Sequence, residues 1–122
     1  MNIIDIKNEE LYKFRKYVKN FVMIKKLKYN QNIYALCQDN IFMSTIFVTK
    51  YNKIEINHMY TNINHRNKGY SSYLLKYLIN LARSNNFNSL EAYILPNCNS
   101  IYIFKNFGFN INGDFAFFKI KN

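Results

Sequence analysis

The stretch "NHRNKGYSSYLLKYL", from Asn64 to Leu78, decides how this chain of 122 residues is expected to fold. Its second half predicts an amphipathic helix that continues past the stretch, because apolar residues recur there at helical spacing. The apolar side consists of Tyr70, Leu74, Leu75, Leu78, Leu81 and Ala82, and the opposite side of Ser72, Lys76 and Arg83. The first half places Gly69, one of only three glycines in the chain, between a basic loop and this helix.

The loop "RNKGYS", residues 66–71, has the composition of a phosphate-binding turn. The first amides of a helix have no internal partners, and the helix dipole adds roughly half a positive charge there. Gly69 has no Cβ, so an anion could approach its backbone closely, and the Ser71 hydroxyl could add a donor. Arg66 and Lys68 bring positive charge. The loop lacks the Gly-Lys-Ser/Thr of a P-loop and the three glycines of a dinucleotide fingerprint, so a plain strand-to-helix turn is the alternative.

The first thirty residues predict one strand and one helix. Residues 2–6 have the pattern of a short strand. Asn8 can cap a helix that runs from Glu9 to about Asn20. The apolar face of this helix consists of Leu11, Phe14, Val18 and Phe21. Residues 21–30 are ambiguous and could form a second short helix.

The rest of the chain predicts a sheet with two further helices. Runs of β-prone residues joined by short polar turns indicate an antiparallel meander at 32–37, 41–49 and 54–61. After the helix at Tyr70, the pattern predicts a strand at 89–95 that ends at Pro96, a short helix at 97–106 capped by Asn97 or Asn99, and a hairpin from Gly108 that turns at Asn112-Gly113. This order predicts one α+β domain over residues 1–122, with a mixed, mostly antiparallel sheet and helices on both faces.

The composition is that of a packed globular protein with excess positive charge. Hydrophobic residues make up 49% of the chain, and the formal net charge is +10. This charge favours an anionic ligand and admits a nucleic-acid-binding domain. The lysines are scattered, however, and the bias toward Asn, Lys, Ile and Tyr is what AT-rich codons produce, so a solvated basic surface is the preferred interpretation. No run approaches the roughly 18 apolar residues of a membrane-spanning helix, and no metal site is expected.

The chain also carries few marks of an exported protein. Its start, "MNIIDIKNEE", has no basic stretch followed by an apolar one, so a secretion signal is not expected. The two cysteines, Cys37 and Cys98, do not make a disulfide framework. We therefore expect reduced thiols in a cytoplasmic protein.

Two segments resemble the motifs of one family. "RNKGYS" is similar to the Gln/Arg-x-x-Gly-x-Gly/Ala loop of the GCN5-related N-acetyltransferases (GNAT), which binds the pyrophosphate of acetyl-coenzyme A. "NCNSIYIFKNFGF" resembles the later Asn-x-x-Ala…Tyr-x-x-x-Gly-Phe segment of that family, with matching places at Asn97, Ser100, Phe104, Gly108 and Phe109. The resemblance implies a GNAT fold and an enzyme that moves an acetyl group from acetyl-coenzyme A to a primary amine, by direct attack in a ternary complex.

The resemblance also implies which residues bind the coenzyme. The pyrophosphate would lie on Arg66, Asn67, Lys68, Gly69, Tyr70 and Ser71, and the pantetheine would contact Met59, Tyr60, Thr61, Asn97 and Phe104. Ser71 departs mildly from the second Gly/Ala of the loop. Phe104 stands where many members carry a tyrosine that protonates the departing thiolate, which phenylalanine cannot do. Tyr102 is two residues away and points to a different helix face (~200° round), so the acid is left unassigned.

A base is needed because an ammonium must lose a proton before it attacks a thioester. In the histone-acetylating branch of the family, this base is a glutamate eleven residues before the Gln/Arg of the loop. Glu55 lies eleven residues before Arg66 and is the first candidate. His58, on the same predicted strand, is the second, because its ordinary pKa suits the task. A carboxylate paired with a lysine and a structural histidine are the alternatives.

The identity of the acceptor stays open between a small-molecule amine and a protein amine, and the chain could form a homodimer. Two other functions remain as alternatives. With Phe104 in the acid position, the protein could hold an acyl-coenzyme A as a sensor or scaffold without turning it over. A basic nucleic-acid-binding domain is the less favoured second alternative, and it predicts affinity for oligonucleotides that falls steeply with salt. Cys98 could be acylated, although a bystander thiol is the preferred interpretation.

Overall fold

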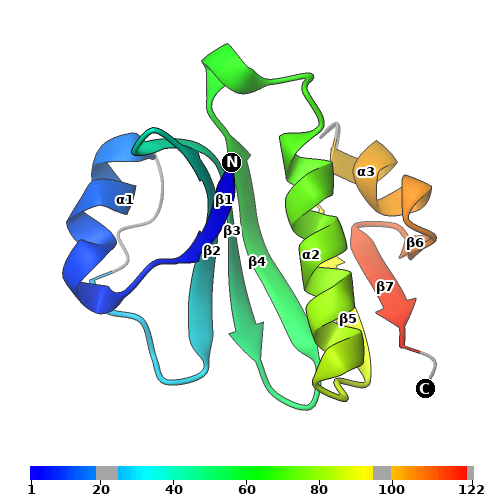
Figure 1. Cartoon of the computed structure of the whole chain (residues 1–122). Coiled ribbons are helices and arrows are strands. Elements are labelled where there is room, and N and C mark those ends of the chain that lie inside the picture. Colours follow the sequence, from blue (N-terminus) through cyan, green and yellow to red (C-terminus); the bar gives the residue numbers. More distant parts are fainter. Residues whose placement is uncertain (19–24, 95–99, 121–122) are drawn as a thin grey trace.

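The computed structural model describes residues 1–18, 25–94 and 100–120, which form one seven-stranded sheet with helices on both faces (Figure 1). The elements are β1 (Asn2–Asp5), the 3₁₀ turn η1 (Asn8–Glu10), α1 (Leu11–Tyr17), β2 (Gln31–Gln38), β3 (Ile41–Lys50), β4 (Ile54–Thr61), the 3₁₀ turn η2 (Ile63–His65), α2 (Tyr70–Ser84), β5 (Ser89–Tyr93), α3 (Ser100–Asn106), β6 (Asn110–Asn112) and β7 (Phe115–Lys119). The strand order is β1-β2-β3-β4-β5-β7-β6. Only β4 and β5 pair in parallel, so the predicted mixed, mostly antiparallel sheet is confirmed.

Two hydrophobic clusters cover the two faces of the sheet. The α2 cluster contains Leu74, Leu75, Leu78, Ile79 and Ala82 of α2, Phe104 of α3, and strand residues that include Tyr34, Leu36, Ile46, Val48, Ile54 and Ile56. The α1 cluster contains Ile6, Leu11, Phe14, Val18, Leu27, Ile33 and Ala35. Side chains alternate between faces along a strand, so β2 contributes to both clusters in turn and is buried on both sides.

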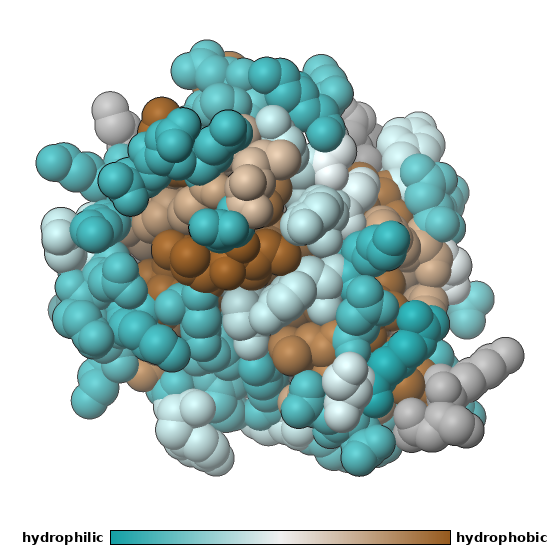
Figure 2. Space-filling view, in the orientation of Figure 1, coloured by the Kyte–Doolittle hydropathy of each residue, from teal (hydrophilic) through white to brown (hydrophobic). Residues whose placement is uncertain are grey.

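The helix predicted from the opening stretch is confirmed as α2. Its polar side faces solvent, and Figure 2 shows a mainly hydrophilic surface with hydrophobic side chains gathered between α1 and α2. At 15 residues, α2 is the longest helix that the structure describes. None of the described helices is both long and apolar enough to cross a membrane.

β4 and β5 stay paired over only a short length. Their parallel register joins Ile54 to Leu90, Glu55 to Glu91 and Ile56 to Ala92, and β4 continues for five more residues, 57–61, without a partner in β5. On the other side of β4, the register with β3 shifts between Phe47 and Val48. This shift leaves one extra residue in β4, a bulge that bends the strand. β4 and β5 therefore separate toward the C-terminal end of β4, which leads into the loop before α2.

The N-terminal helix differs from its prediction. It begins as η1 and continues as α1, which ends at Tyr17 instead of about Asn20. Asn8 does not cap it; the Oδ1 atom of Asn8 accepts a hydrogen bond from the amide of Leu27 at 2.7 Å. The predicted apolar face is confirmed at its three described positions, all of which are buried. Residues 25–30 form no helix, and residues 19–24, which include Phe21, lie outside the described chain.

The boundaries near the C-terminus also shift. β5 ends at Tyr93 instead of 95, because the amide of Ile94 leaves the ladder and donates to the carbonyl of Asp114 at 2.6 Å. The final hairpin turns at Gly113-Asp114, one residue later than predicted, and Gly113 adopts a φ of 63°. Pro96 and the proposed caps Asn97 and Asn99 lie outside the described residues.

Leu78→Ala should lower the free energy of unfolding by about 2–5 kcal/mol, because Leu78 is fully buried between α2 and the sheet and its truncation leaves a cavity. Tyr73→Ala is the matched control on the same helix, since Tyr73 is 54% exposed, and it should change this free energy by less than about 0.5 kcal/mol. Urea unfolding followed by circular dichroism gives both values. Similar losses in the two variants would contradict the placement of α2.

Candidate active site

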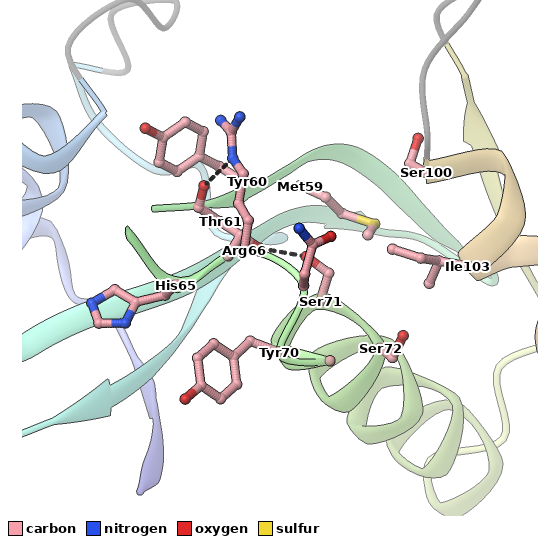
Figure 3. A pocket seen from close by; sticks show the side chains of 12 residues that line it. Met59, Tyr60, Thr61, His65, Arg66, Tyr70, Ser71, Ser72, Ser100 and Ile103 are labelled. Carbon is pink, nitrogen blue, oxygen red and sulfur yellow. Dashed lines mark hydrogen bonds between the residues drawn. The ribbon is translucent and has the colours of Figure 1, made fainter. Parts of the chain in front are cut away.

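A pocket opens between the N-terminus of α2 and the end of β4 that pairs with β3 but no longer with β5 (Figure 3). Its cavity volume is about 770 Å³. The lining residues are Met59, Tyr60, Thr61, His65, Arg66, Asn67, Gly69, Tyr70, Ser71, Ser72, Ser100 and Ile103. The fold thus brings together in one cavity eight of the eleven residues predicted to bind the coenzyme.

The N-terminus of α2 presents free backbone donors to this pocket. The amide of Tyr73 donates to the carbonyl of Gly69 at 3.0 Å. The amides before it, at residues 70–72, lack intrahelical acceptors by helix geometry, and Gly69 offers no side chain to cap them. Gly69 adopts a φ of 77°, and a Cβ added there would meet no atom within 4 Å. Within the protein, the left-handed backbone is therefore the reason for a glycine at this position, because no neighbouring protein atom excludes a side chain.

A chain of hydroxyl groups joins the start of α2 to the sheet. The Oγ of Ser71 lies 2.6 Å from the Oγ1 of Thr61, which lies 2.9 Å from the Oγ of the fully buried Ser44. Ser44 donates to the carbonyl of Tyr60 at 3.0 Å. The Oγ of Ser71 also lies 3.4 Å from that of Ser44, and in each contact between two of these hydroxyl groups either oxygen can be the donor. The Ser71 hydroxyl therefore has two partners within the protein, Thr61 and Ser44, whereas the backbone amide of Ser71 has no intrahelical acceptor.

The basic residues of the loop occupy different positions. Arg66 is exposed, lines the pocket, and donates from Nε to the carbonyl of Thr61 at 3.2 Å, which leaves the rest of its guanidinium group available. Lys68 is exposed and does not line the pocket. The partly buried ring of His65 does line it, and its Nδ1 has no hydrogen-bond partner among the described residues. Positive charge thus lies at the rim, outside the backbone donors.

Glu55 lies on the opposite face of the sheet. Its neighbours Ile54 and Ile56 both pack in the α2 cluster, so the side chain of Glu55 points away from α2. The carboxylate accepts a hydrogen bond from Nδ2 of Asn57 at 3.0 Å. Glu55 is also the register partner of Glu91 on β5. The first candidate base is therefore separated from the pocket by the sheet, and it does not line the cavity.

His58 lies on the same far face. The next residue, Met59, packs against the α2 cluster, and strand alternation turns His58 the other way. The His58 ring stacks on Tyr60, with centroids 6.3 Å apart and planes 12° apart. Burial lowers the pKa of His58 below its ordinary value of 6.5, so the ring is neutral at pH 7 and able to accept a proton. Both candidate bases thus lie across the sheet from the pocket, Glu55 where β4 still pairs with β5 and His58 beyond that pairing.

Phe104 is packed in the core and does not line the pocket. It is 3% exposed and meets Phe109 edge to face, with centroids 5.0 Å apart. Its helix α3 lines the pocket instead with Ser100 and Ile103, which are one turn apart. Tyr102 is exposed and does not line the pocket either. Asn97, predicted to bind the coenzyme, lies outside the described residues, as does Cys98.

Four pocket residues were not predicted from the sequence: His65, Ser72, Ser100 and Ile103. Ser72 could have been found, because it supplies the third amide of the predicted helix. The helical spacing of three between Ser100 and Ile103 puts them on one face, but nothing in the sequence says that this face meets the pocket. No group of three or more His, Cys, Asp or Glu in residues 1–18, 25–94 and 100–120 could hold a metal ion.

Comparison with known proteins agrees with this geometry. A profile of the Acetyltransferase (GNAT) family matches residues 5–109. No curated protein sequence matches the chain. Among solved structures, the ribosomal-protein-S18-alanine N-acetyltransferase from Escherichia coli superimposes with a TM-score of 0.83 at 12% identity, covering 99% of this chain and 96% of that one.

Two further solved structures show the same fold. Tetrahymena GCN5 superimposes with a TM-score of 0.75 at 14% identity, covering 99% of this chain and 97% of that one. A putative N-acetyltransferase from E. coli, YhhK, solved bound to coenzyme A, gives a TM-score of 0.71 at 15% identity, with 98% of each chain covered. These likenesses show a shared arrangement of helices and strands that extends over nearly the whole chain.

Ser44→Ala should lower the free energy of unfolding by about 1–3 kcal/mol, because it removes one hydrogen-bond partner from the Thr61 hydroxyl and one from the Tyr60 carbonyl in a buried place. Ser84→Ala, an exposed change near the end of α2, is the control and should have little effect. Thermal unfolding of both variants measures the difference. An unchanged transition in Ser44→Ala would argue against the hydroxyl chain as a tether for α2.

Proposed function

Because this chain belongs to the Acetyltransferase (GNAT) family, we propose that it moves an acetyl group from acetyl-coenzyme A to a primary amine. One observation carries the proposal: the uncapped N-terminus of α2 opens into a cavity of about 770 Å³ beside the unpaired end of β4. Backbone amides at a helix N-terminus suit a diphosphate, and a free strand edge suits the amide groups of pantetheine. The residues present therefore fit the two polar parts of the coenzyme.

In this proposal the chain binds the coenzyme mainly with its backbone. The amides of residues 69–72 hold the pyrophosphate, and Arg66 adds charge at the rim. The edge of β4 at residues 59–61, which has no partner in β5, pairs with pantetheine. Asn97 would contact pantetheine from the other side. Lys68 contributes only a longer-range attraction, because its side chain does not line the cavity.

The reaction then needs an acetyl group in the gap between β4 and β5 and an amine that reaches it from the far face. Bringing both substrates to one place supplies a large part of the acceleration, and backbone amides of the splayed strand polarise the thioester carbonyl. Glu55, directly or through water, removes the proton from the ammonium, with the neutral ring of His58 as the second candidate.

We propose direct transfer in a ternary complex. The thiol of Cys37 is a poor nucleophile, because burial raises its pKa to about 11 and keeps it protonated at neutral pH. An acetyl group trapped covalently on Cys98 would overturn the direct route.

One observation favours the second function, an acyl-coenzyme A sensor that does not turn its ligand over. The position of the usual acid is occupied by Phe104, which has no proton to give and lies in the core. Tyr70 is a phenol-bearing residue that lines the pocket, whereas the ring of Tyr60 packs against the α1 cluster on the other face of the sheet. A thiol-release assay with a panel of amines separates the two functions: tight binding of acetyl-coenzyme A with no release for any amine supports the sensor.

Gly69→Leu should weaken acetyl-coenzyme A binding at least about tenfold, or about 1.4 kcal/mol, because its side chain would project into the space beside the free amides. Gly113→Leu is a matched control: Gly113 has a similar φ of 63°, and an added Cβ there also meets no atom within 4 Å. Both variants should lose similar stability from the left-handed backbone, and only Gly69→Leu should lose affinity. Calorimetry measures the affinity, and intact binding in Gly69→Leu would count heavily against the proposed site.

Glu55→Gln should lower kcat by about 10²–10⁴-fold if the carboxylate removes the proton, while the affinity for acetyl-coenzyme A stays unchanged. His58→Gln should keep most of the activity at pH 8. The kcat values of the wild type and of His58→Gln should diverge as the pH falls below 6.5 and toward the lowered pKa of His58. In this range the histidine ring becomes charged, whereas the glutamine side chain stays neutral. Profiles of kcat against pH test both variants. A larger loss in His58→Gln than in Glu55→Gln would move the base to the histidine.

A further inference from the structure

One part of the sheet carries side chains that belong to neither hydrophobic cluster. The register places Glu55 beside Glu91, Glu91 beside Phe117, and Tyr93 beside Phe115. Partners in neighbouring strands point to the same side, so these five residues share the face of β4, β5 and β7 turned away from α2. We name it the acceptor face. In Figure 1 α2 lies in front of this part of the sheet, so the acceptor face is the side turned from the viewer.

The aromatic residues of the acceptor face form a row that solvent can reach. The rings of Tyr93 and Phe115 have centroids 5.2 Å apart, and those of Phe115 and Phe117 lie 6.4 Å apart with planes 25° apart. Tyr93 is 73% exposed, and both phenylalanines are partly exposed. Three adjacent rings at the surface can bury a flat apolar group, and aromatic rings prefer stacked or tilted contacts at about these spacings.

The acceptor face is also locally acidic in a strongly basic protein. Glu91 accepts a hydrogen bond from the ammonium of Lys53 at 2.6 Å, and this bond raises the pKa of Lys53. Glu55 adds a second carboxylate beside this pair, so the three groups sum to one negative charge. Lys119 lies beside Ser89, one residue pair on this face further along β5 and β7 than the pair Glu91–Phe117. In a chain with formal charge +10, this is a place that a single cation would favour.

The acceptor face adjoins the opening between the strands. Pairing of β4 with β5 ends at Ile56 and Ala92, and the next residue of β5 is Tyr93. A group that stacks on Tyr93 would therefore lie beside the gap in which the proposed function places the thioester. The aromatic row and the acidic group thus meet at the point where an acceptor must arrive.

We infer that the acceptor is a small monoamine that carries one aromatic ring on a short linker, an inference that rests on the proposed function. Its ring lies on Tyr93, Phe115 and Phe117, and its ammonium lies beside Glu55. A polyamine is disfavoured, because its further charges would meet Lys53, Lys119 and the overall positive field. A free amino acid is disfavoured as well, because its carboxylate would be repelled by Glu55 and Glu91.

The proposed acetyl transfer on this face conserves atoms and charge. The ammonium gives one proton to Glu55, which passes it to solvent. The amine nitrogen then forms a bond to the thioester carbon, and the carbon–sulfur bond breaks. The second nitrogen proton goes to the departing thiolate, so the products are the N-acetylated amine, coenzyme A and one proton in solution.

Calorimetry on protein saturated with coenzyme A tests the inference without turnover. We expect 2-phenylethylamine to bind at least about tenfold more tightly than butylamine, which lacks the ring, and more tightly than spermidine or phenylacetate. Tyr93→Ala should remove this preference, whereas Tyr29→Ala, the same change at a fully exposed position, should keep it. Phe117→Leu removes a ring with little loss of volume, so it tests the same preference should Tyr93→Ala fold poorly.

Several outcomes would overturn the inference. Equal binding of the two monoamines, tighter binding of spermidine, or an unchanged preference in both ring variants would do so. A Tyr93→Ala variant that turns a dimer into a monomer would assign the acceptor face to contact between copies of the chain. Failure of coenzyme A itself to bind would count against the proposed function, whereas coenzyme binding and thiol release with no preference for a ring would count against this inference alone.

Discussion

The packing of α2 against the sheet is the interaction on which the site depends. The apolar side of α2 buries Leu74, Leu75 and Leu78 against β2, β3 and β4, and this fixes both the axis of the helix and the place where it starts. The hydroxyl chain through Ser44 then ties that start to the end of β4. Free amides at a helix start are common to all helices. Here the sheet holds them beside a free strand edge, and this combination makes a site.

The second constraint is the short pairing between β4 and β5. Parallel strands need a crossover between them, which here is the α2 helix, so the same element that carries the amides also sets where the two strands meet and part. The bulge opposite Phe47 and Val48 bends β4 at the point where its pairing with β5 ends. Beyond Ile56 and Ala92 the two strands are no longer paired. In the proposed function, the coenzyme enters here from the side of α2 and the proposed bases act from the other.

The charges are divided between these faces in a way that suits two substrates of opposite sign. Arg66 and the helix N-terminus lie on the face of α2, where the proposed function places the phosphates of the coenzyme. Glu55 and Glu91 lie on the opposite face, where an amine would approach as a cation. A net charge of +10 raises the local concentration of the anionic coenzyme, and the carboxylates give the far face a different preference. Each substrate is therefore favoured on its own side.

The sequence by itself determined the elements whose signal is local. Apolar spacing predicted α2 and placed β4 at Ile54–Thr61, and the glycine in a basic loop marked a segment that lines the pocket, because periodicity and backbone freedom act within a few residues. Only the tertiary structure decided which partners meet: Asn8 binds the Leu27 amide instead of capping a helix, and the Ser71 hydroxyl contacts that of Thr61. It also placed Phe104 in the core and turned Glu55 and His58 away from the pocket. These outcomes depend on contacts between segments far apart in the chain, which no local pattern records.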